Sequence, residues 1–451
     1  MSDPVRVPGV EGAIVRRGDA GYEDVRASRL WNGYQPRRHP EVIVRAATVR
    51  DVPAAIALAR AEGLRVAVRT GGHSWCGTPL RDGGMLLDLS ALRRCTVGPG
   101  QATATVEPGI RSAELTRILA GAGFAFPTGH APAVALGGYL LGGGLGWNSG
   151  EWGPACASVR AIEVVTAEGE VVRCDERENA DLFWAARGAG PGFFAVVTAF
   201  RLALRPLPAA IAATSYVCHL GEVESLTDWI ADAAEELPPN VEVAFVLLTD
   251  PGSGEVVVSL TGTAFAGSHD EAARALAPLA RAPLSTAPLH RAVAEPTSME
   301  ALYARAAAAW PEGHRYAVDS LWSRADLGTL LTRLGDALGR APSAKSLVLA
   351  PLAPASRNPE LLRNMAFGVL GDAKVAPYAI WDDPSRDEAN VRWQREATAS
   401  VAPLGTGHYI GEADLSADAS HARRSYRAAD WARLGELRAK YDPDGVFHTF
   451  P

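Results

Sequence analysis

Apolar residues recur with two different periods near the start of the chain. EVIVRA (41–46) is a short apolar run that predicts a strand, and the spacing of apolar residues over 48–63 predicts a helix that Gly63 ends. A second apolar run, RVAVRT (65–70), predicts another strand directly after this helix. The order strand, helix, strand is typical of a parallel α/β unit, which binds ligands at the carboxyl ends of its strands. The turn that follows residue 70 is therefore a candidate binding loop.

Similar patterns continue to about residue 206. Apolar runs on both sides of Glu168-Gly169 predict a hairpin, and Pro206 and Pro208 indicate a boundary. The elements expected here are strands at 84–90 and 102–109, a helix from Ser112, a hairpin over 159–174, and a helix, a glycine turn and a strand over 181–204.

The second half of the chain has a different texture. Strand-like runs such as VEVAFVLLT (241–249) alternate with alanine-rich helical stretches such as 269–282, which is typical of an α+β arrangement. Glycine is less frequent here, so we expect this half to shape a pocket. HARRSYRAADWARLGELRAKY (421–441) predicts one helix, closed by Asp442 and Pro443.

Composition narrows the possible functions. The 451 residues are 47% hydrophobic and carry a formal net charge of -7, whereas nucleic-acid binding needs a basic face, so we expect no nucleic-acid partner. Five cysteines without a CxxC pair indicate neither a zinc site nor a complete disulfide framework, and we expect no bound metal. Together with an N-terminus that lacks a signal-peptide pattern, they favour a reducing, cytoplasmic location.

One long segment has no charged side chain. Residues 118–150 contain no Asp, Glu, Lys or Arg, which is long enough to cross a bilayer as a helix. Ten glycines, together with Pro127 and Pro132, argue against a continuous helix. We therefore expect no membrane span and place this segment inside the protein, around a ligand.

Two glycine-rich loops are the strongest chemical signals. Gly71 and Gly72 precede His73, so main-chain N–H groups can approach a ligand closely and a ring nitrogen is available for a covalent bond to a flavin. An ordinary strand-to-turn corner with a surface histidine fits the same residues. The second loop, within 129–147, matches neither GxGxxG nor a Walker loop. It fits either a pyrophosphate cradle of N–H groups or a tight packing corner, and the pair of loops favours a shared ligand.

A series of motifs then follows one order along the chain: RTGGHSWCG, VEPG, PTGHAPAVALGGYLLGGGLGW, AIEVVTAEGEVV, NADLFWAARGAGPGFFAVVTAF and KYDPDGVF. This order resembles the flavin-linked oxidases of the berberine bridge enzyme type, within the vanillyl-alcohol oxidase superfamily, and in particular their smaller bacterial members. The resemblance covers essentially the whole chain. It implies an α+β fold with a PCMH-type FAD-binding domain of two subdomains (1–206), a substrate domain with an antiparallel sheet (207–420) and a C-terminal return to the FAD domain (421–451).

The same resemblance implies how FAD is held. His73 would bond covalently to the flavin, and Ala131 stands where many relatives carry a second attaching cysteine, so we expect a single link. Val134 falls where a small or branched residue admits oxygen, which favours an oxidase over a dehydrogenase. The cofactor-binding residues that the resemblance implies are Arg69, Thr70, Gly71, Gly72, His73, Ser74, Gly77, Thr128, Gly129, Val134, Gly137, Gly138, Gly142, Gly143, Gly144, Val197 and Phe447.

A flavin oxidase also needs a group that takes a proton from the substrate. Tyr426 matches a family position where a tyrosine helps to deprotonate hydroxyl substrates, although a helix aromatic packed in an interface fits it too. His130 is a candidate for placing substrate or tuning the flavin, and a satisfied buried histidine is the alternative. Tyr139 is the third candidate, and like Tyr378 and Tyr409 it either lines a pocket or fills a core.

The function implied is an FAD-dependent oxidase. It would transfer a hydride from an alcohol or amine carbon of a small organic or natural-product substrate to covalent FAD, with O2 as acceptor and H2O2 as product. The alternative is a redox-neutral, flavin-containing cyclase or isomerase. The missing second link and the unusual stretch WGPACASV (152–159) leave room for this alternative.

Overall fold

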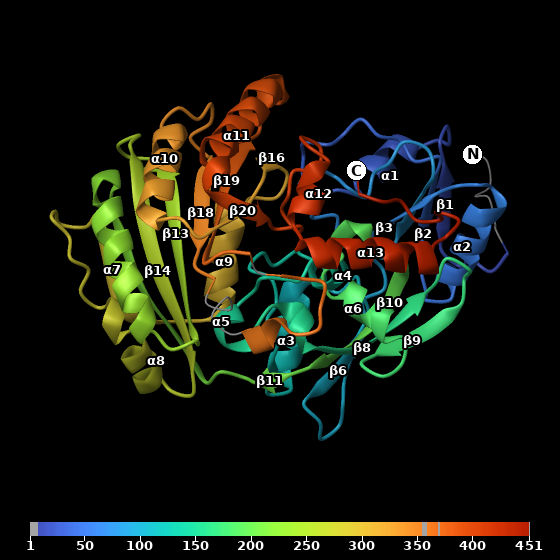
Figure 1. Ribbon diagram of the computed structural model, residues 1–451, viewed down its shortest axis with the longest axis horizontal. Coiled ribbons are helices and arrows are strands. Elements are labelled where there is room, and N and C mark those ends of the chain that lie inside the picture. Colours follow the sequence, from blue (N-terminus) through green and yellow to red (C-terminus); the bar gives the residue numbers. More distant parts are fainter. Residues whose placement is uncertain (1–7, 354–358, 369, 451) are drawn as a thin grey trace.

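The computed structural model describes residues 8–353, 359–368 and 370–450. Helices and strands are mixed and most strand pairs are antiparallel, so the α+β class predicted from the sequence is confirmed. Two main sheets from the first half of the chain lie beside a larger sheet from the second half, and β7 and β11 form a separate two-stranded sheet (Figure 1). Within the described residues, no helix combines the length and the apolar character that crossing a membrane requires.

The first sheet contains the predicted strand-helix-strand unit. Its order is β1-β2-β4-β3, with β2, β4 and β3 parallel and β1 antiparallel to β2. The C-terminal tail covers the open edge of β3, because the Val66 amide donates to the Val446 carbonyl (2.7 Å) and the His448 amide donates to the Val66 carbonyl (2.9 Å). The bounds are β1 (Ala13–Arg16), α1 (Tyr22–Ala27), β2 (Val42–Arg45), α2 (Asp51–Ala61), β3 (Val66–Arg69) and β4 (Met85–Asp88).

The second sheet is antiparallel, in the order β5-β6-β10-β8-β9. The predicted hairpin is confirmed as β8 and β9, with Gly169 at a φ of 85° in the turn. The uncharged segment contains only short helices, as its glycines and prolines predict. The bounds are β5 (Cys95–Val97), β6 (Thr103–Val106), α3 (Ser112–Gly121), β7 (Phe124–Ala125), α4 (Leu136–Leu141), α5 (Ser149–Trp152), β8 (Val159–Val165), β9 (Val171–Asp175), α6 (Ala180–Ala186), β10 (Val196–Ala203) and β11 (Arg205–Pro206).

The third sheet is antiparallel and has nine strands. Its order is β15-β12-β14-β13-β18-β19-β17-β20, and β16 pairs with β19. Figure 1 shows α7, α8 and α10 on its outer side, away from the first two sheets. The bounds are β12 (Ala210–His219), α7 (Val223–Glu236), β13 (Val241–Thr249), β14 (Val256–Ala266), α8 (His269–Ala275), β15 (His290–Thr297), α9 (Met299–Ala309), β16 (Arg315–Val318), β17 (Leu321–Ser323), α10 (Leu327–Leu338), β18 (Leu347–Pro351), β19 (Ala373–Trp381), α11 (Asp387–Val401) and β20 (Gly405–His408).

The two faces of this sheet have different partners. A strand sends alternate side chains to opposite faces. On β13, Val243, Phe245 and Leu247 belong to the core beneath α7 and α10, whereas Ala244 and Val246, from the other face, line a cavity. The helices therefore cover one face, and the other is available to form the wall of a binding site.

The prediction of one helix over 421–441 is wrong. The structure has two helices, α12 (Ser420–Arg424) and α13 (Ala428–Tyr441). The Ser425 hydroxyl donates to the His421 carbonyl (2.8 Å), and Arg427 is extended, with a ψ of 150°. The break allows Tyr426 to turn inward and pack on Trp431.

Candidate active site

The loop after β3 is held in place by the N-terminal segment. Gly72 has a φ of 74°, and a Cβ there would lie 2.3 Å from the Arg29 carbonyl oxygen, so only glycine fits. The Trp31 amide donates to the Gly72 carbonyl (2.9 Å), and Arg69 donates through Nη1 to Asp88 (2.7 Å). These contacts fix the main chain directly before His73.

His73 is a half-buried imidazole with a shielded, unpaired nitrogen. Its ring stacks on Trp31, with centroids 4.6 Å apart and planes 22° apart, and its Nε2 has no hydrogen-bond partner among the described residues. Burial, with smaller effects of Arg111 and Arg69, lowers the pKa of His73 to about 3. The ring is therefore neutral at physiological pH and keeps a lone pair for bond formation.

The second glycine segment packs directly against this loop. A Cβ on Gly71 would lie 2.8 Å from the Ala135 Cβ, and one on Gly137 would lie 2.7 Å from the Thr70 Cγ2. The Gly138 amide donates to the Thr70 hydroxyl (3.3 Å), while a Cβ at Gly138 would meet no atom closer than 3.8 Å. The two loops predicted from the sequence to share a ligand thus form one surface, whose main chain is bare toward the cavity.

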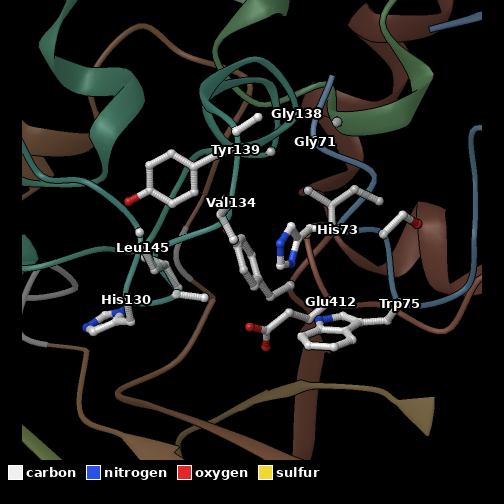
Figure 2. A pocket seen from close by; sticks show the side chains of 18 of the residues that line it. Gly71, His73, Trp75, His130, Val134, Gly138, Tyr139, Leu145 and Glu412 are labelled. Atoms are coloured by element: carbon white, nitrogen blue, oxygen red, sulfur yellow. The ribbon is translucent and has the colours of Figure 1, made fainter. Parts of the chain in front are cut away.

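This surface is one wall of a cavity of about 690 Å³. In Figure 2, His73 and Glu412 face the same space, with Gly71 and Gly138 at one end and His130 near the other. Ala131 also lines the cavity. The sequence-predicted residues that line it are Arg69, Thr70, Gly71, Gly72, His73, Ser74, Gly129, His130, Val134, Gly137, Gly138, Tyr139, Gly142, Val197 and Phe447.

Four predicted cofactor residues lie outside this lining and have structural contacts instead. A Cβ on Gly77 would meet Pro36, and one on Gly143 would lie 2.3 Å from the Phe367 ring. Gly144 packs against the Tyr139 ring, and the Thr128 hydroxyl is hydrogen bonded to Tyr303 (2.9 Å). These residues pack behind the two glycine loops and support their shape without lining the cavity.

Tyr426, the predicted proton acceptor, is also outside the lining. Its hydroxyl donates to the Gly188 carbonyl (3.1 Å), its ring packs on Trp431 and Phe450, and burial raises its pKa. The structure therefore does not bring Tyr426 to the cavity.

The opposite wall carries a charged group that sequence reasoning missed. Lys374, on β19, donates to the Glu412 carboxylate, and the Tyr378 hydroxyl donates to Oε1 of Glu412 (3.2 Å). Burial, followed by the charge of Glu412, raises the pKa of Tyr378. Tyr378 also meets Trp75 edge to face, with centroids 5.6 Å apart. A carboxylate with a cation and a phenol beside it is thus presented to the cavity.

Signals for these residues are present but weak. Lys374 is one of three lysines in the chain and lies in the apolar stretch AKVAPYAIW, where a lone cation needs a partner. Tyr378 was a candidate for a pocket or a core, and it lines the pocket. Glu412 lies in the loop GEAD, whose composition does not distinguish it from a solvated turn.

A second carboxylate lies at the other end of the same wall. Glu242, on β13, accepts from Nε2 of His130 and from the Asn148 amide (3.0 Å). His130 also packs on Trp147, with ring centroids 4.2 Å apart. Tyr139 lies further back and donates to the Pro127 carbonyl (2.8 Å), while burial raises its pKa. His130 is therefore held at the cavity by a partner from the large sheet.

A half-buried, neutral histidine, bare glycine loops and a charged cluster across one cavity define the site of a flavin-dependent oxidoreductase. Comparisons with known proteins agree. Residues 40–175 match the family model described as FAD binding domain. The FAD-linked oxidoreductase nodO of Hypoxylon pulicicidum is 32% identical over 394 residues, which is 87% of each chain. The chain belongs to the FAD-linked oxidoreductases of the berberine bridge enzyme type.

One further relative and two solved structures extend the comparison over nearly the whole chain. The (R)-6-hydroxynicotine oxidase of Paenarthrobacter nicotinovorans is 27% identical over 99% of this chain and 98% of its own. The crystal structure of 6-hydroxy-D-nicotine oxidase from Arthrobacter nicotinovorans superposes with a TM-score of 0.84, at 24% identity and 98% coverage of each chain. That of xylooligosaccharide oxidase from Myceliophthora thermophila with xylobiose has a TM-score of 0.79, at 23% identity, and covers 98% of this chain and 96% of its own. The PCMH-type fold is thereby confirmed.

Proposed function

We propose that the protein is an FAD-dependent oxidase that acts on an alcohol or amine carbon of a small organic molecule. One observation carries the proposal: the neutral imidazole of His73 and the Glu412 carboxylate line the same cavity. His73 would hold FAD covalently, and the main chain of Gly71, Gly72 and Gly138 would lie along it. When bound, FAD supplies the hydride acceptor.

Glu412 is the proton acceptor in this proposal. Burial disfavours the phenolate of Tyr378, so the neutral phenol donates to Glu412, and Lys374 stabilises the carboxylate as an anion. The substrate loses a proton from its oxygen or nitrogen to Glu412 and a hydride from the adjacent carbon, forming a C=O or C=N bond. The two electrons and two protons lost leave as one H2O2 when O2 is the acceptor.

The rest of the wall supports an organic substrate with a substantial apolar surface. Val246 and Leu248 from β13, Leu349 from β18 and Trp310 after α9 line the cavity together. Oxidases of 6-hydroxynicotine and of xylooligosaccharides are among the relatives, so both an amine and a sugar hydroxyl belong in the first tests. We infer that the polar cluster around Glu412 orients the reacting group and that the apolar wall holds the remainder.

The test is a peroxide-coupled screen of alcohols, sugars and cyclic amines, followed by anaerobic mixing of each active compound with the enzyme. We expect a substrate to bleach the visible flavin band without oxygen, and air to restore the band with one H2O2 per turnover. Product formation without bleaching would favour the redox-neutral cyclase or isomerase instead. Reduction by dithionite and exposure to air, without substrate, is the control for reoxidation alone.

Attachment through His73 alone is part of this proposal. Ala131 lines the cavity but offers no sulfur, and Cys156 lies outside the lining residues, with burial raising its thiol pKa to about 12. Cys76 does line the cavity, but burial raises its thiol pKa as well. Neither thiol is activated for bond formation, so a single histidyl link is expected.

A further inference from the structure

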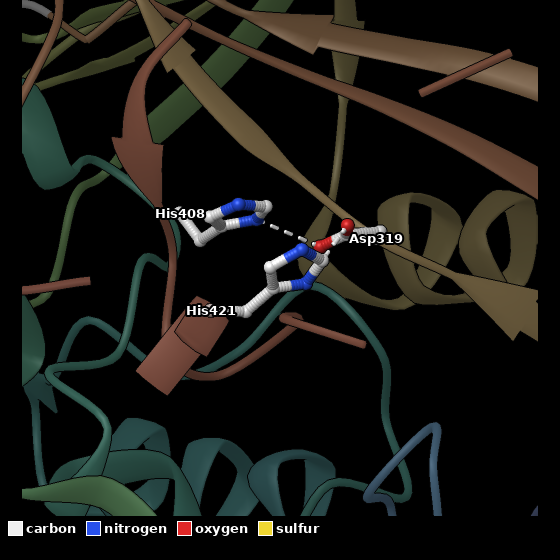
Figure 3. A group of neighbouring side chains, drawn as sticks. All are labelled: Asp319, His408 and His421. Atoms are coloured by element: carbon white, nitrogen blue, oxygen red, sulfur yellow. Dashed lines mark hydrogen bonds and ion pairs between the residues drawn. The ribbon is translucent and has the colours of Figure 1, made fainter. Parts of the chain in front are cut away.

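Outside the lining of the cavity, Asp319, His408 and His421 form a polar cluster where the large sheet meets the C-terminal helices (Figure 3). Asp319 lies between β16 and β17, His408 ends β20, and His421 is in α12. Asp319 is 3% exposed and His408 is 1% exposed. A buried carboxylate is costly unless it is well hydrogen bonded, so this cluster needs an explanation.

The Asp319 carboxylate ties together both ends of one short loop. Its Oδ1 accepts from Nδ1 of His408 (3.0 Å) and from the Asp414 amide (3.1 Å). The five residues between these two anchors, 409–413, all line the cavity, and Glu412 is one of them. A single buried side chain therefore closes the loop that presents the proposed proton acceptor.

Closing a loop at its base restricts the residues that it carries. Within the loop, the Glu412 amide donates to the Tyr409 carbonyl (2.9 Å), and beyond it the Asp414 carboxylate accepts from the Ala417 amide (3.1 Å). A loop tied at its base holds the main chain of Glu412 in place beside Lys374. We propose that Asp319 is a positioning residue, a hydrogen-bond hub that fixes the loop 409–413 and so places Glu412; the inference rests on the proposed role of Glu412.

Two histidines and a carboxylate also suit a divalent metal, but the ring geometry opposes it. The His408 and His421 rings stack with centroids 3.9 Å apart and planes 20° apart. An imidazole binds a metal through a lone pair in its own ring plane, and the lone pairs of nearly parallel, stacked rings do not converge on one point. Asp319 Oδ2 lies 3.4 Å from His421 Nδ1 without a hydrogen bond to it, so His421 packs against the hub without joining its hydrogen bonds.

Amide hydrogen exchange on the holoenzyme tests the hub directly. Asp319→Ala removes the acceptor, whereas Asp319→Asn keeps an oxygen for Asp414 and offers an N–H to the unpartnered Nδ1 of His421. We expect exchange across 409–416 to accelerate about tenfold or more in D319A and to stay near wild type in D319N. Asp336→Asn, at an exposed carboxylate on α10, is the matched control and should leave exchange across 409–416 unchanged.

The outcomes that overturn the hub are equally specific. The hub is overturned if amide exchange across 409–416 is unchanged in D319A, or if it accelerates equally in D319A and D319N. If D319A does not yield folded enzyme, Asp319→Ser replaces it, because its shorter hydroxyl cannot reach both anchors. A stoichiometric divalent metal in the purified enzyme, absent from D319A and D319N, would assign the cluster to metal binding and would also overturn the hub.

Flavin reduction then links the hub to the reaction. The substrate is the first active compound in a series that begins with 6-hydroxynicotine and xylobiose. With it, the flavin of D319A should be reduced about tenfold more slowly than that of wild type, and D319N should restore the wild-type rate. In the double variant with Glu412→Gln, D319A should add no further loss, since no carboxylate is left to place. If the double variant reduced its flavin more slowly than E412Q alone, by the factor seen in D319A, the positioning role of Asp319 would be overturned. If E412Q alone reduced its flavin at the wild-type rate, the role of Glu412 as proton acceptor would be refuted. The hydrogen-exchange experiment would still test whether Asp319 fixes the loop 409–413.

Discussion

The two walls of the cavity are built in different ways. The wall that would hold the cofactor comes mainly from two short stretches of chain, 69–75 and 129–145, whose glycines and histidines are close in sequence. The facing wall takes single residues from separate elements: Glu242 from β13, Lys374 and Tyr378 from β19, and Glu412 from the loop after β20. One wall is a local structure, whereas the other exists only after the nine-stranded sheet has formed.

This difference separates what the two walls do. The cofactor wall exposes main chain and the neutral imidazole of His73, and its polar groups are held by the first sheet and the N-terminal segment. The substrate wall presents charged side chains, each held by a partner from another element. Changes on the first wall should therefore alter how the flavin is held or reoxidised, and changes on the second should alter how the substrate reacts.

The largest expected effect is on attachment of the flavin. His73→Ala should abolish all flavin that remains with the protein after acid precipitation, because the proposed tether is removed. His448→Ala is the matched control: this residue also lines the cavity with a buried, unpartnered Nε2, and burial lowers its pKa to about 4. The H448A pellet should stay yellow. A yellow H73A pellet would show that the cofactor wall does not work through His73.

The next effect belongs to the substrate wall. Glu412→Gln keeps the shape of the side chain but removes the proton acceptor, and should slow flavin reduction by about 10²- to 10⁴-fold. Tyr426→Phe should keep the rate of flavin reduction within about twofold of wild type. Its free energy of unfolding should fall by roughly 1 kcal/mol, because the hydrogen bond to the Gly188 carbonyl is lost. Stopped-flow reduction and urea unfolding measure both. If Tyr426→Phe slowed flavin reduction more than Glu412→Gln did, Tyr426 and not Glu412 would be the proton acceptor.

These two residues also show where sequence reasoning ends. Strands, the β8–β9 hairpin and the glycine loops followed from local patterns, since each is decided by neighbouring residues. Tyr426 was misplaced because Ser425 and an extended Arg427 break the expected helix, and the buried packing of Tyr426 is a tertiary effect. Glu412 could not be singled out because its partners, Lys374 and Tyr378, are more than thirty residues away and meet it only across the sheet.

A smaller effect should separate the two walls, because one should affect reoxidation of the flavin and the other binding of the substrate. Val134→Leu adds bulk on the cofactor wall and should slow reoxidation by O2 about tenfold, with flavin reduction unchanged, because less room is left for oxygen. Val246→Leu makes the same change on the substrate wall, where Val246 also lines the cavity. It should raise KM and leave reoxidation as it was. Equal slowing of reoxidation by both variants would mean that oxygen reaches the flavin without passing Val134.

The last effect concerns stability and tests only the cofactor wall. In cofactor-free protein, the pKa of His73 is about 3 when folded and near 6.5 when unfolded, so between these values the unfolded chain binds one more proton. Folding stability should therefore fall as the pH falls from 6.5 toward 3, by up to about 1.4 kcal/mol per pH unit from this residue. His73→Ala should remove that part of the slope in urea unfolding measured between pH 6 and pH 4, whereas His269→Ala, at an exposed position, should not. An unchanged slope in H73A would mean that the imidazole gains water or a partner before flavin arrives, and that the cofactor wall is not preformed.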